Sequence, residues 1–152
     1  MTSHHSPCIF CDIVNNNAKS FTVFATDQYS LVLDIYPITF GHMLLISHTH
    51  ASHIHQLPEQ EFSAMIEATK KITEKLPASL PDISDCNIII NNGSTANQHI
   101  PHAHIHIIPR RKGDTLRFYW RLLTRFVLPF SRLNSTQKLE NAHQALEAIL
   151  LK

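Results

Sequence analysis

The stretch His102-Ala103-His104-Ile105-His106-Ile107 places a histidine at every second position. In a β-strand, successive side chains point to opposite faces of the sheet, so alternate residues share one face. A strand over 102–108 would therefore carry three imidazoles on one face and apolar side chains on the other. Imidazole changes charge near neutral pH, and it can bind a metal, transfer a proton or attack an electrophile. This strand is the first candidate for a functional site.

Length and composition predict a single globular domain. The chain has 152 residues, of which 43% are hydrophobic and 16% are charged, and this length can bury a core without disulfide support. No apolar run approaches the roughly 20 residues that a membrane span needs. Residues 1–7 lack the basic stretch and following hydrophobic stretch of a secretory signal. We therefore expect a cytoplasmic protein without a membrane span.

Charge and histidine are distributed unevenly along the chain. The net charge is only +1, but 4 Lys and Arg stand against 9 Asp and Glu before Arg110, and 9 against 3 from Arg110 onward. A basic last quarter indicates contact with phosphate, a partner or a membrane surface. Nine of the 12 histidines lie within 42–55 and 99–106. The histidines are the stronger of the two signals.

The order of the predicted elements indicates an α+β fold. Five runs rich in apolar and β-branched residues predict strands. They cover residues 21–25, 29–34, 42–47, 86–91 and 102–108. Pro58 suits the first turn of a helix with an apolar stripe, and Pro77 and Pro81 are expected to end it. The pattern predicts a mainly antiparallel five-stranded sheet with a helix packed on it.

The last part of the chain is expected to be a C-terminal helical tail. We divide the chain into a domain over 1–114 and a basic helical extension of the same domain over 115–152. An apolar stripe, broken near Pro129, consists of Leu116, Trp120, Leu123, Val127 and Phe130. Ser135 is the expected N-cap of a last helix. Its inner face would hold Leu139, Ala142, Leu146 and Ile149.

Arginines recur every four residues on the other face of the first tail helix, at Arg117, Arg121 and Arg125. In the simplest interpretation the apolar stripe docks on the sheet or on a second subunit, and the arginines are solvated. In a second interpretation, some arginines reach over the site to a polyphosphate. Binding to a membrane surface or to nucleic acid is a third.

The three cysteines do not indicate a disulfide framework, because their number is odd and no secretion signal is present. Cys8 and Cys11 have the two-residue gap that allows both thiolates to reach one tetrahedral zinc ion. Two reduced thiols without metal, or a redox pair, are the alternatives. Cys86 lies in an apolar run and is expected to be a small core residue.

The histidine run resembles the signature of the histidine triad family, a group of nucleotide hydrolases and transferases. Other segments resemble the same family, over roughly residues 8–114. They are Leu31–Asp34, Gly41-His42, His48-Thr49-His50, Asn91-Asn92-Gly93 and Gln98. Ordered partners at these distances make the match much more specific than an isolated His-x-His-x-His.

The resemblance implies roles for the histidines. His104 would attack the α-phosphorus of a nucleotide and form a covalent nucleotidyl-histidine, which water then hydrolyses. His106 and His42 would donate hydrogen bonds to the phosphate oxygens, and one of them would protonate the leaving group.

The resemblance also implies nucleotide-binding residues. Asp34 would accept hydrogen bonds from the ribose, while Asn91 and Gln98 would donate to the phosphate or to the bridging oxygen. The base would lie between apolar side chains, namely Phe10, Ile13 and Leu33. His99 stands where some members of the family carry a small hydroxyl residue that contacts phosphate.

By resemblance to bacterial zinc-containing members, zinc would be held by Cys8, Cys11, His50 and His102. Such a site would be structural, since protein atoms occupy all four positions.

The expected activity is release of a nucleoside monophosphate, with adenine as the favoured base. Pro109-Arg110 after the triad resembles the dinucleotide-hydrolase branch and favours a dinucleoside polyphosphate. A purine nucleoside phosphoramidase, or a nucleotide-binding adaptor with little turnover, is the alternative. The resemblance further implies a homodimer whose sheets join into one, and no nucleic-acid partner is expected.

Overall fold

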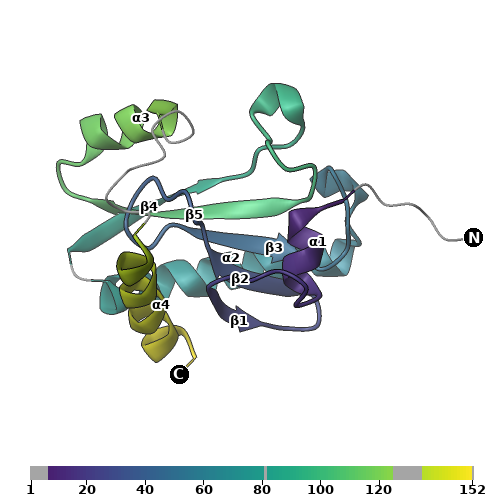
Figure 1. Cartoon of the computed structure of the whole chain (residues 1–152), viewed down its shortest axis with the longest axis horizontal. Helices are drawn as coiled ribbons and strands as arrows, with labels where there is room; N and C mark the ends of the chain where they lie inside the picture. The colour runs from purple at the N-terminus through teal and green to yellow at the C-terminus, as the bar shows by residue number, and fades with distance from the viewer. Residues whose placement is uncertain (1–6, 81, 125–134, 152) are drawn as a thin grey trace, which may run out of the picture.

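The computed structural model describes residues 7–80, 82–124 and 135–151. Its centre is a five-stranded antiparallel sheet in the order β1-β2-β3-β5-β4 (Figure 1). The strands are β1 (Thr22–Ala25), β2 (Tyr29–Leu33), β3 (Met43–Ser47), β4 (Ile83–Ile89) and β5 (His104–Arg111). The predicted α+β class is thus confirmed.

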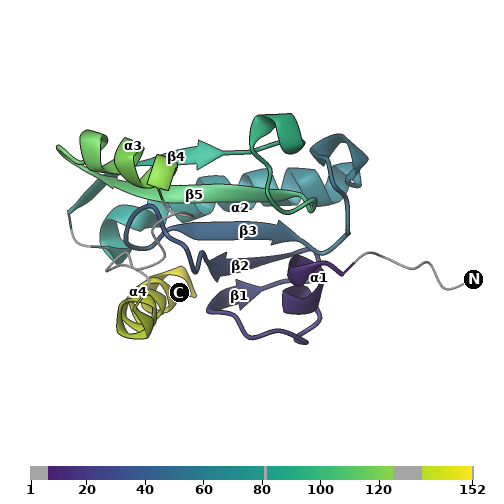
Figure 2. The same ribbon diagram turned by 45° about the horizontal axis from the view of Figure 1, so that its top comes forward.

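One face of the sheet is covered by helix α2 (Glu59–Ser79), and α4 (Thr136–Leu150) packs against α2 and β1 (Figure 2). Leu139, Ala142 and Leu146 are buried on the inner face of α4, as predicted. Pro77 lies inside α2 and does not end it, contrary to the expectation; the helix ends at Ser79, and Pro81, the other residue expected to end it, lies outside the described residues. A proline so close to the C-terminus withholds only one backbone donor from the last turns. Among the described residues, no helix has the length and apolar content needed to cross a bilayer.

The opposite face of the sheet carries a short helix at each end. Helix α1 (Ile9–Val14), which the sequence did not predict, lies near the start of β5, and α3 (Thr115–Thr124) lies near its end (Figure 1). Two 3₁₀ turns complete the fold, η1 (Ile54–Gln56) and η2 (Ser94–Ala96). The histidine side chains lie in the middle of this face, between the two helices.

The histidine strand begins later than predicted. β5 starts at His104, and the N–H of His102 bonds to the carbonyl of Ile100 instead of a neighbouring strand. The side-chain alternation holds even so. All three histidines are buried, while Ala103 and the isoleucines of this run belong to the core under α2.

Helix α3 does not dock its apolar stripe on the sheet, which was one of the two predicted positions, and the other position, against a second subunit, is not tested by a single chain. The stripe residues Leu116, Trp120 and Leu123 are 85%, 63% and 78% exposed, and the buried residue is Phe118. Phe118 packs against apolar residues of the sheet, and the guanidinium of Arg110 lies 4.0 Å from the centre of its ring. Helical periodicity does not encode these contacts, which determine the face of α3 that is turned toward the sheet. Arg125, Val127, Pro129 and Phe130 lie outside the described residues.

Candidate functional site

Three buried histidines touch in a row across the middle of the sheet. Nε2 of His42 lies 3.0 Å from Nδ1 of His106, and Nε2 of His106 lies 3.2 Å from Nε2 of His104. Nδ1 of His104 lies 2.6 Å from the carbonyl oxygen of His102. The side chains come from β5 and from the residue before β3, so antiparallel pairing of these two strands brings the three rings together.

The backbone at both ends of this row determines which nitrogens carry hydrogen. The Ile38 N–H donates to Nδ1 of His42 at 3.2 Å, so His42 donates from Nε2 to His106. At the other end, the carbonyl of His102 can only accept, so Nδ1 of His104 carries the hydrogen. With neutral rings, His106 then donates to Nε2 of His104. Nε2 of His104 is thus the unprotonated nitrogen of that ring, the form that a nucleophile needs, and its lone pair accepts the hydrogen bond from His106 until that bond is released.

The loop between β2 and β3 places a carboxylate beside this row. Gly41 has a φ of +78°, and a Cβ there would come within 2.5 Å of Leu80 Cδ1, so only glycine fits before His42. Asp34 accepts a hydrogen bond from the Tyr36 N–H at 2.8 Å. Its second oxygen lies 3.5 Å from Nδ1 of His42.

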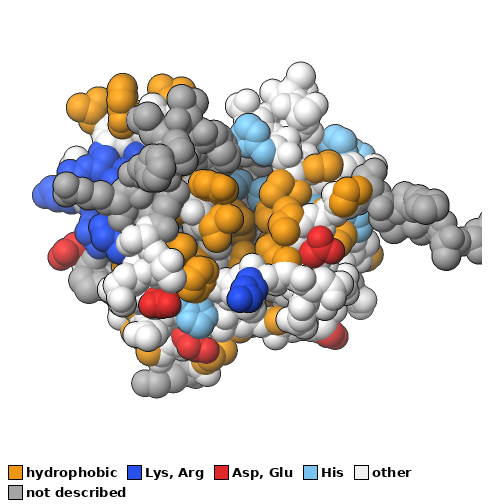
Figure 3. Space-filling view, viewed as in Figure 1, with side chains coloured by type: hydrophobic (Ala, Val, Ile, Leu, Met, Phe, Trp, Pro, Cys, Tyr) orange, Lys and Arg blue, Asp and Glu red, His pale blue; other side chains and the backbone are white. Residues whose placement is uncertain are grey.

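A cavity of about 210 Å³ is lined by His104 and His106 together with α1 and β2, and we call it the nucleoside cavity after the ligand that the sequence resemblance implies. Five other predicted site residues line it, namely Phe10, Ile13, Leu33, Asp34 and His99. The ring of Phe10 meets the ring of His104 edge-on, with centroids 5.0 Å apart. Figure 3 shows a hollow on this face between two groups of hydrophobic side chains.

Sequence reasoning missed several residues of this cavity, among them Lys19, Ser20, Tyr36 and Asn97. Tyr36 and Asn97 each lie within two residues of a predicted site residue, and that proximity was the available signal. Lys19 and Ser20 belong to no motif, and only the return of the chain from α1 to β1 brings them to the cavity.

Two predicted phosphate contacts lie elsewhere. The Gln98 amide donates to the carbonyl of Ser52 at 2.8 Å and to that of His102 at 3.3 Å, and its oxygen accepts from the Gly93 N–H at 2.7 Å. Asn91 donates to the carbonyl of Asn97 at 3.4 Å. Neither residue lines the nucleoside cavity. Both side chains shape the loop before β5.

A second cluster joins α1 to a residue that follows β3 and a residue that precedes β5, at one end of the sheet. Cys8 and Cys11 are one helical turn apart, and their sulfurs face His50 and His102, so that all four candidate ligand atoms lie within 4.8 Å of one another. The two Nδ1 atoms are 3.3 Å apart, and the sulfur–nitrogen distances are 3.2 to 3.6 Å. A tetrahedral zinc ion requires about 3.3 Å between two nitrogens and about 3.6 Å between nitrogen and sulfur. The donor set therefore fits such an ion.

The protein orients His102 for this role. Its Nε2 lies 2.8 Å from the carbonyl oxygen of Ser47, to which it donates, and this leaves the Nδ1 lone pair directed at the cluster. Burial lowers the pKa of His102, which keeps the ring neutral. Burial, with Cys8 next to it, raises the pKa of Cys11 to about 11 in the absence of a cation. The cluster could hold a metal ion with four protein ligands.

Comparison with known proteins identifies one family. The HIT domain family matches residues 15–113. An adenosine 5'-monophosphoramidase from Candida albicans is 34% identical over 114 residues, which cover 73% of this chain and 75% of that protein. An adenylylsulfatase from Arabidopsis thaliana is 32% identical over 72% of this chain and 55% of its own length.

A solved structure extends the similarity to the tail. The crystal structure of a Zn-bound histidine triad family protein from Mycobacterium smegmatis superimposes with a TM-score of 0.77 at 29% identity. It covers 95% of this chain and 93% of its own.

Proposed function

Because the chain belongs to the HIT domain family, we propose that it is a hydrolase that cleaves a nucleotide at the α-phosphate and releases a nucleoside monophosphate. His104 is the nucleophile. The observation that carries this assignment is the hydrogen bond from its Nδ1 to the carbonyl of His102, which keeps Nε2 unprotonated beside the nucleoside cavity, where a bound phosphate would replace His106 as its partner.

The reaction proceeds in two displacements. Nε2 of His104 bonds to phosphorus while the bond to the leaving group breaks. The leaving group departs with a proton from the pair formed by His42 and His106, which a bound phosphate favours in its protonated form. Water then bonds to phosphorus as the P–N bond breaks. One water proton restores the pair, and the other remains on the phosphate. Two displacements replace one difficult step.

The nucleoside occupies the cavity beside α1. Phe10, Ile13 and Leu33 supply apolar surface for the base, with adenine favoured, and the Asp34 carboxylate accepts from the ribose hydroxyls. The position of Asp34 supports this role, because the residue is buried at the wall of the cavity and one of its carboxylate oxygens accepts a hydrogen bond from a backbone N–H.

Two leaving-group classes remain for the experiment to separate. The residues that favoured dinucleoside polyphosphates, Pro109 and Arg110, lie in β5, where Pro109 is paired with β4 and Arg110 bonds to Asp114. Neither lines the nucleoside cavity, so their support for that substrate is weakened. The Candida relative instead favours a phosphoramidate.

Zinc is the metal that we propose for the cysteine–histidine cluster, since the donor distances suit it and a similar structure holds it. Bound there, it would fasten α1 beside the start of β5 as a structural ion. The four ligands would be Cys8, Cys11, His50 and His102.

We further propose that the protein is a homodimer whose sheets join along β4. This strand forms one edge of the sheet, and Ile88 on it is 49% exposed. An edge strand of this kind can pair with a second copy. The molar mass from light scattering tests this, and a monomeric mass at micromolar concentration would exclude it.

The decisive experiment is mass spectrometry after rapid quenching. Wild-type protein mixed with an adenosine phosphoramidate or a diadenosine polyphosphate should show an added AMP on His104, and the His104→Asn variant should show none. Tight AMP binding without adduct or turnover would indicate an adaptor instead. The ratio of kcat/KM on the two substrates then identifies the leaving group.

A further inference from the structure

A second cavity lies near the C-terminal end of β5, between α3 and α4. Its volume is about 580 Å³, and we call it the basic cleft, because its walls include Arg111, Arg117, Arg121 and Lys138. It shares no lining residue with the nucleoside cavity. One loop separates the two, since residues 34–36 line the nucleoside cavity and 38–40 line the basic cleft.

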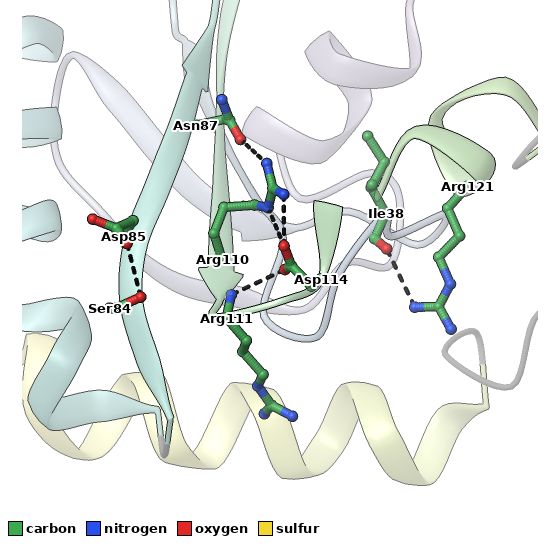
Figure 4. A network of polar contacts seen from close by, with 8 residues as sticks. All are labelled: Ile38, Ser84, Asp85, Asn87, Arg110, Arg111, Asp114 and Arg121. Carbon is green, nitrogen blue, oxygen red and sulfur yellow. Dashed lines mark hydrogen bonds and ion pairs between the residues drawn. The ribbon is translucent and has the colours of Figure 1, made fainter. Parts of the chain in front are cut away.

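The only acidic residue lining the basic cleft in the described part of the chain is already paired. Asp114 accepts from Nε and Nη2 of Arg110 at 2.9 and 2.6 Å, and from the Arg111 N–H at 2.9 Å (Figure 4). These donors hold the pKa of Asp114 below its ordinary value. Arg110 itself does not line the cleft. The charge of the Asp114 carboxylate is thus compensated by the guanidinium of Arg110, which lies outside the lining of the cleft.

The four cationic side chains of the cleft have no such partner. Among the described residues, no carboxylate lies within ion-pair distance of any of them. Arg121 is half-buried and donates to the carbonyl of Ile38 at 3.3 Å, and Figure 4 shows the Arg111 guanidinium directed toward α4. Burial and the neighbouring Arg117 lower the pKa of Arg121. Like charges gathered in a concave site repel one another, and an anion would relieve that repulsion.

The cleft also offers uncharged donors and apolar walls. Asn141 of α4 supplies an amide, and Phe40 and Phe118 supply aromatic surface. A ligand with several charged oxygens could satisfy these groups together.

We propose that the basic cleft is a second ligand site, which binds a chain of linked phosphates. The cations come from β5, α3 and α4, so they surround the volume instead of converging on one point, and an extended polyanion matches that arrangement better than a single phosphate. The volume also exceeds that of the nucleoside cavity. The site does not depend on the proposed hydrolysis, since it uses none of the histidines.

The test is calorimetric titration of the full chain with inorganic tripolyphosphate at about 100 mM salt, in the presence of saturating AMP to occupy the nucleoside cavity. We expect a Kd below about 100 μM. The double variant Arg117→Gln, Lys138→Gln should raise the Kd at least about tenfold. Lys70→Gln, on the exposed surface of α2, is the matched control and should change it by less than about twofold. A second titration with ATP under the same conditions distinguishes a nucleoside polyphosphate from a bare phosphate chain.

Three outcomes would overturn the proposal. They are the absence of binding to either probe, binding that AMP abolishes and the double variant does not weaken, and binding of single-stranded RNA through the same residues more tightly than either probe. The last result would assign the surface to nucleic acid. Melting temperatures of the variants close to that of the wild type would show that a weaker Kd reflects lost charge.

Discussion

The two ends of β5 carry cationic or potentially cationic side chains in opposite situations. At its start, imidazoles form a closed row in which each nitrogen has a partner and backbone groups terminate both ends. At its end, Arg110 donates to Asp114 and Asn87, while Arg111, Arg117 and Arg121 line a cleft and have no carboxylate within ion-pair distance among the described residues. The imidazoles at the start of β5 are hydrogen-bonded to one another and to the backbone, whereas the charged groups at its end line an open cleft.

The difference shows how each end selects its ligand. Neutral histidines can be buried at modest cost because every hydrogen bond is made, and they remain poised for a reaction at a single nitrogen. Permanently charged guanidinium groups cannot be neutralised by losing a proton, so they remain partly exposed and attract anions. The first end is suited to chemistry and the second to binding.

The largest expected difference between the two ends of β5 is in the effect of a substitution on kcat. His104→Asn keeps a donor toward the carbonyl of His102 but removes the Nε2 lone pair, so kcat should fall about 10⁴-fold or more. Asn87→Ala, which removes an acceptor of Arg110 at the other end, should leave kcat within about threefold. Steady-state assays on both variants, with circular dichroism to verify folding, make the comparison. Equal losses would mean that the two ends do not differ in function.

The second expected difference is in stability and concerns the proposed zinc site. Removing zinc with a chelator, or substituting Cys11→Ser, should lower the free energy of unfolding by about 4 kcal/mol, the amount that a ligand at about 1,000 times its Kd contributes. The melting temperature would fall by roughly 10 °C.

Cys86→Ser is the matched control for this prediction, because Cys86 lies in β4 outside the cluster. Elemental analysis should find about one zinc per chain in the control and little in Cys11→Ser. Full stability without any bound metal would refute a structural zinc site.

The sequence predicted the start of β5 much better than its end. A period of two determines which histidines share a face, and that rule survived even though the strand begins at His104. The position of Gln98 was not predictable in this way, because its amide satisfies backbone groups from distant segments. For α3, the apolar stripe predicted a face docked on the sheet or on a second subunit, whereas within this chain Phe118, in contact with Arg110, is the buried residue and the stripe is exposed. Periodicity identifies the apolar face of a helix, but it does not predict which surface is available to cover that face.

The smallest expected difference is in the free energy of unfolding at acid pH. Because Arg110 lowers the pKa of Asp114 in the folded state, the pair stabilises the fold fully above the ordinary value of 3.8. That stabilisation is lost as the pH falls through the lower, folded-state pKa. Asp114→Asn should therefore cost about 1–2 kcal/mol at pH 7 and almost nothing well below pH 3.8.

Urea unfolding of both proteins across this range, followed by circular dichroism, measures the difference. Trp120, the single tryptophan, lies on α3 and reports that helix separately by fluorescence. A cost that is the same at every pH would show that the pair contributes through packing alone.

One residue belongs to both clusters at the start of β5. The ring of His102 faces the two sulfurs, and its carbonyl accepts the Nδ1 hydrogen of His104, the proposed nucleophile. A side chain and the carbonyl of the same residue cannot shift independently by much. The contacts of the two thiols with that ring therefore also constrain the orientation of the His104 imidazole, and in the proposed reaction they would influence the angle at which its Nε2 approaches phosphorus.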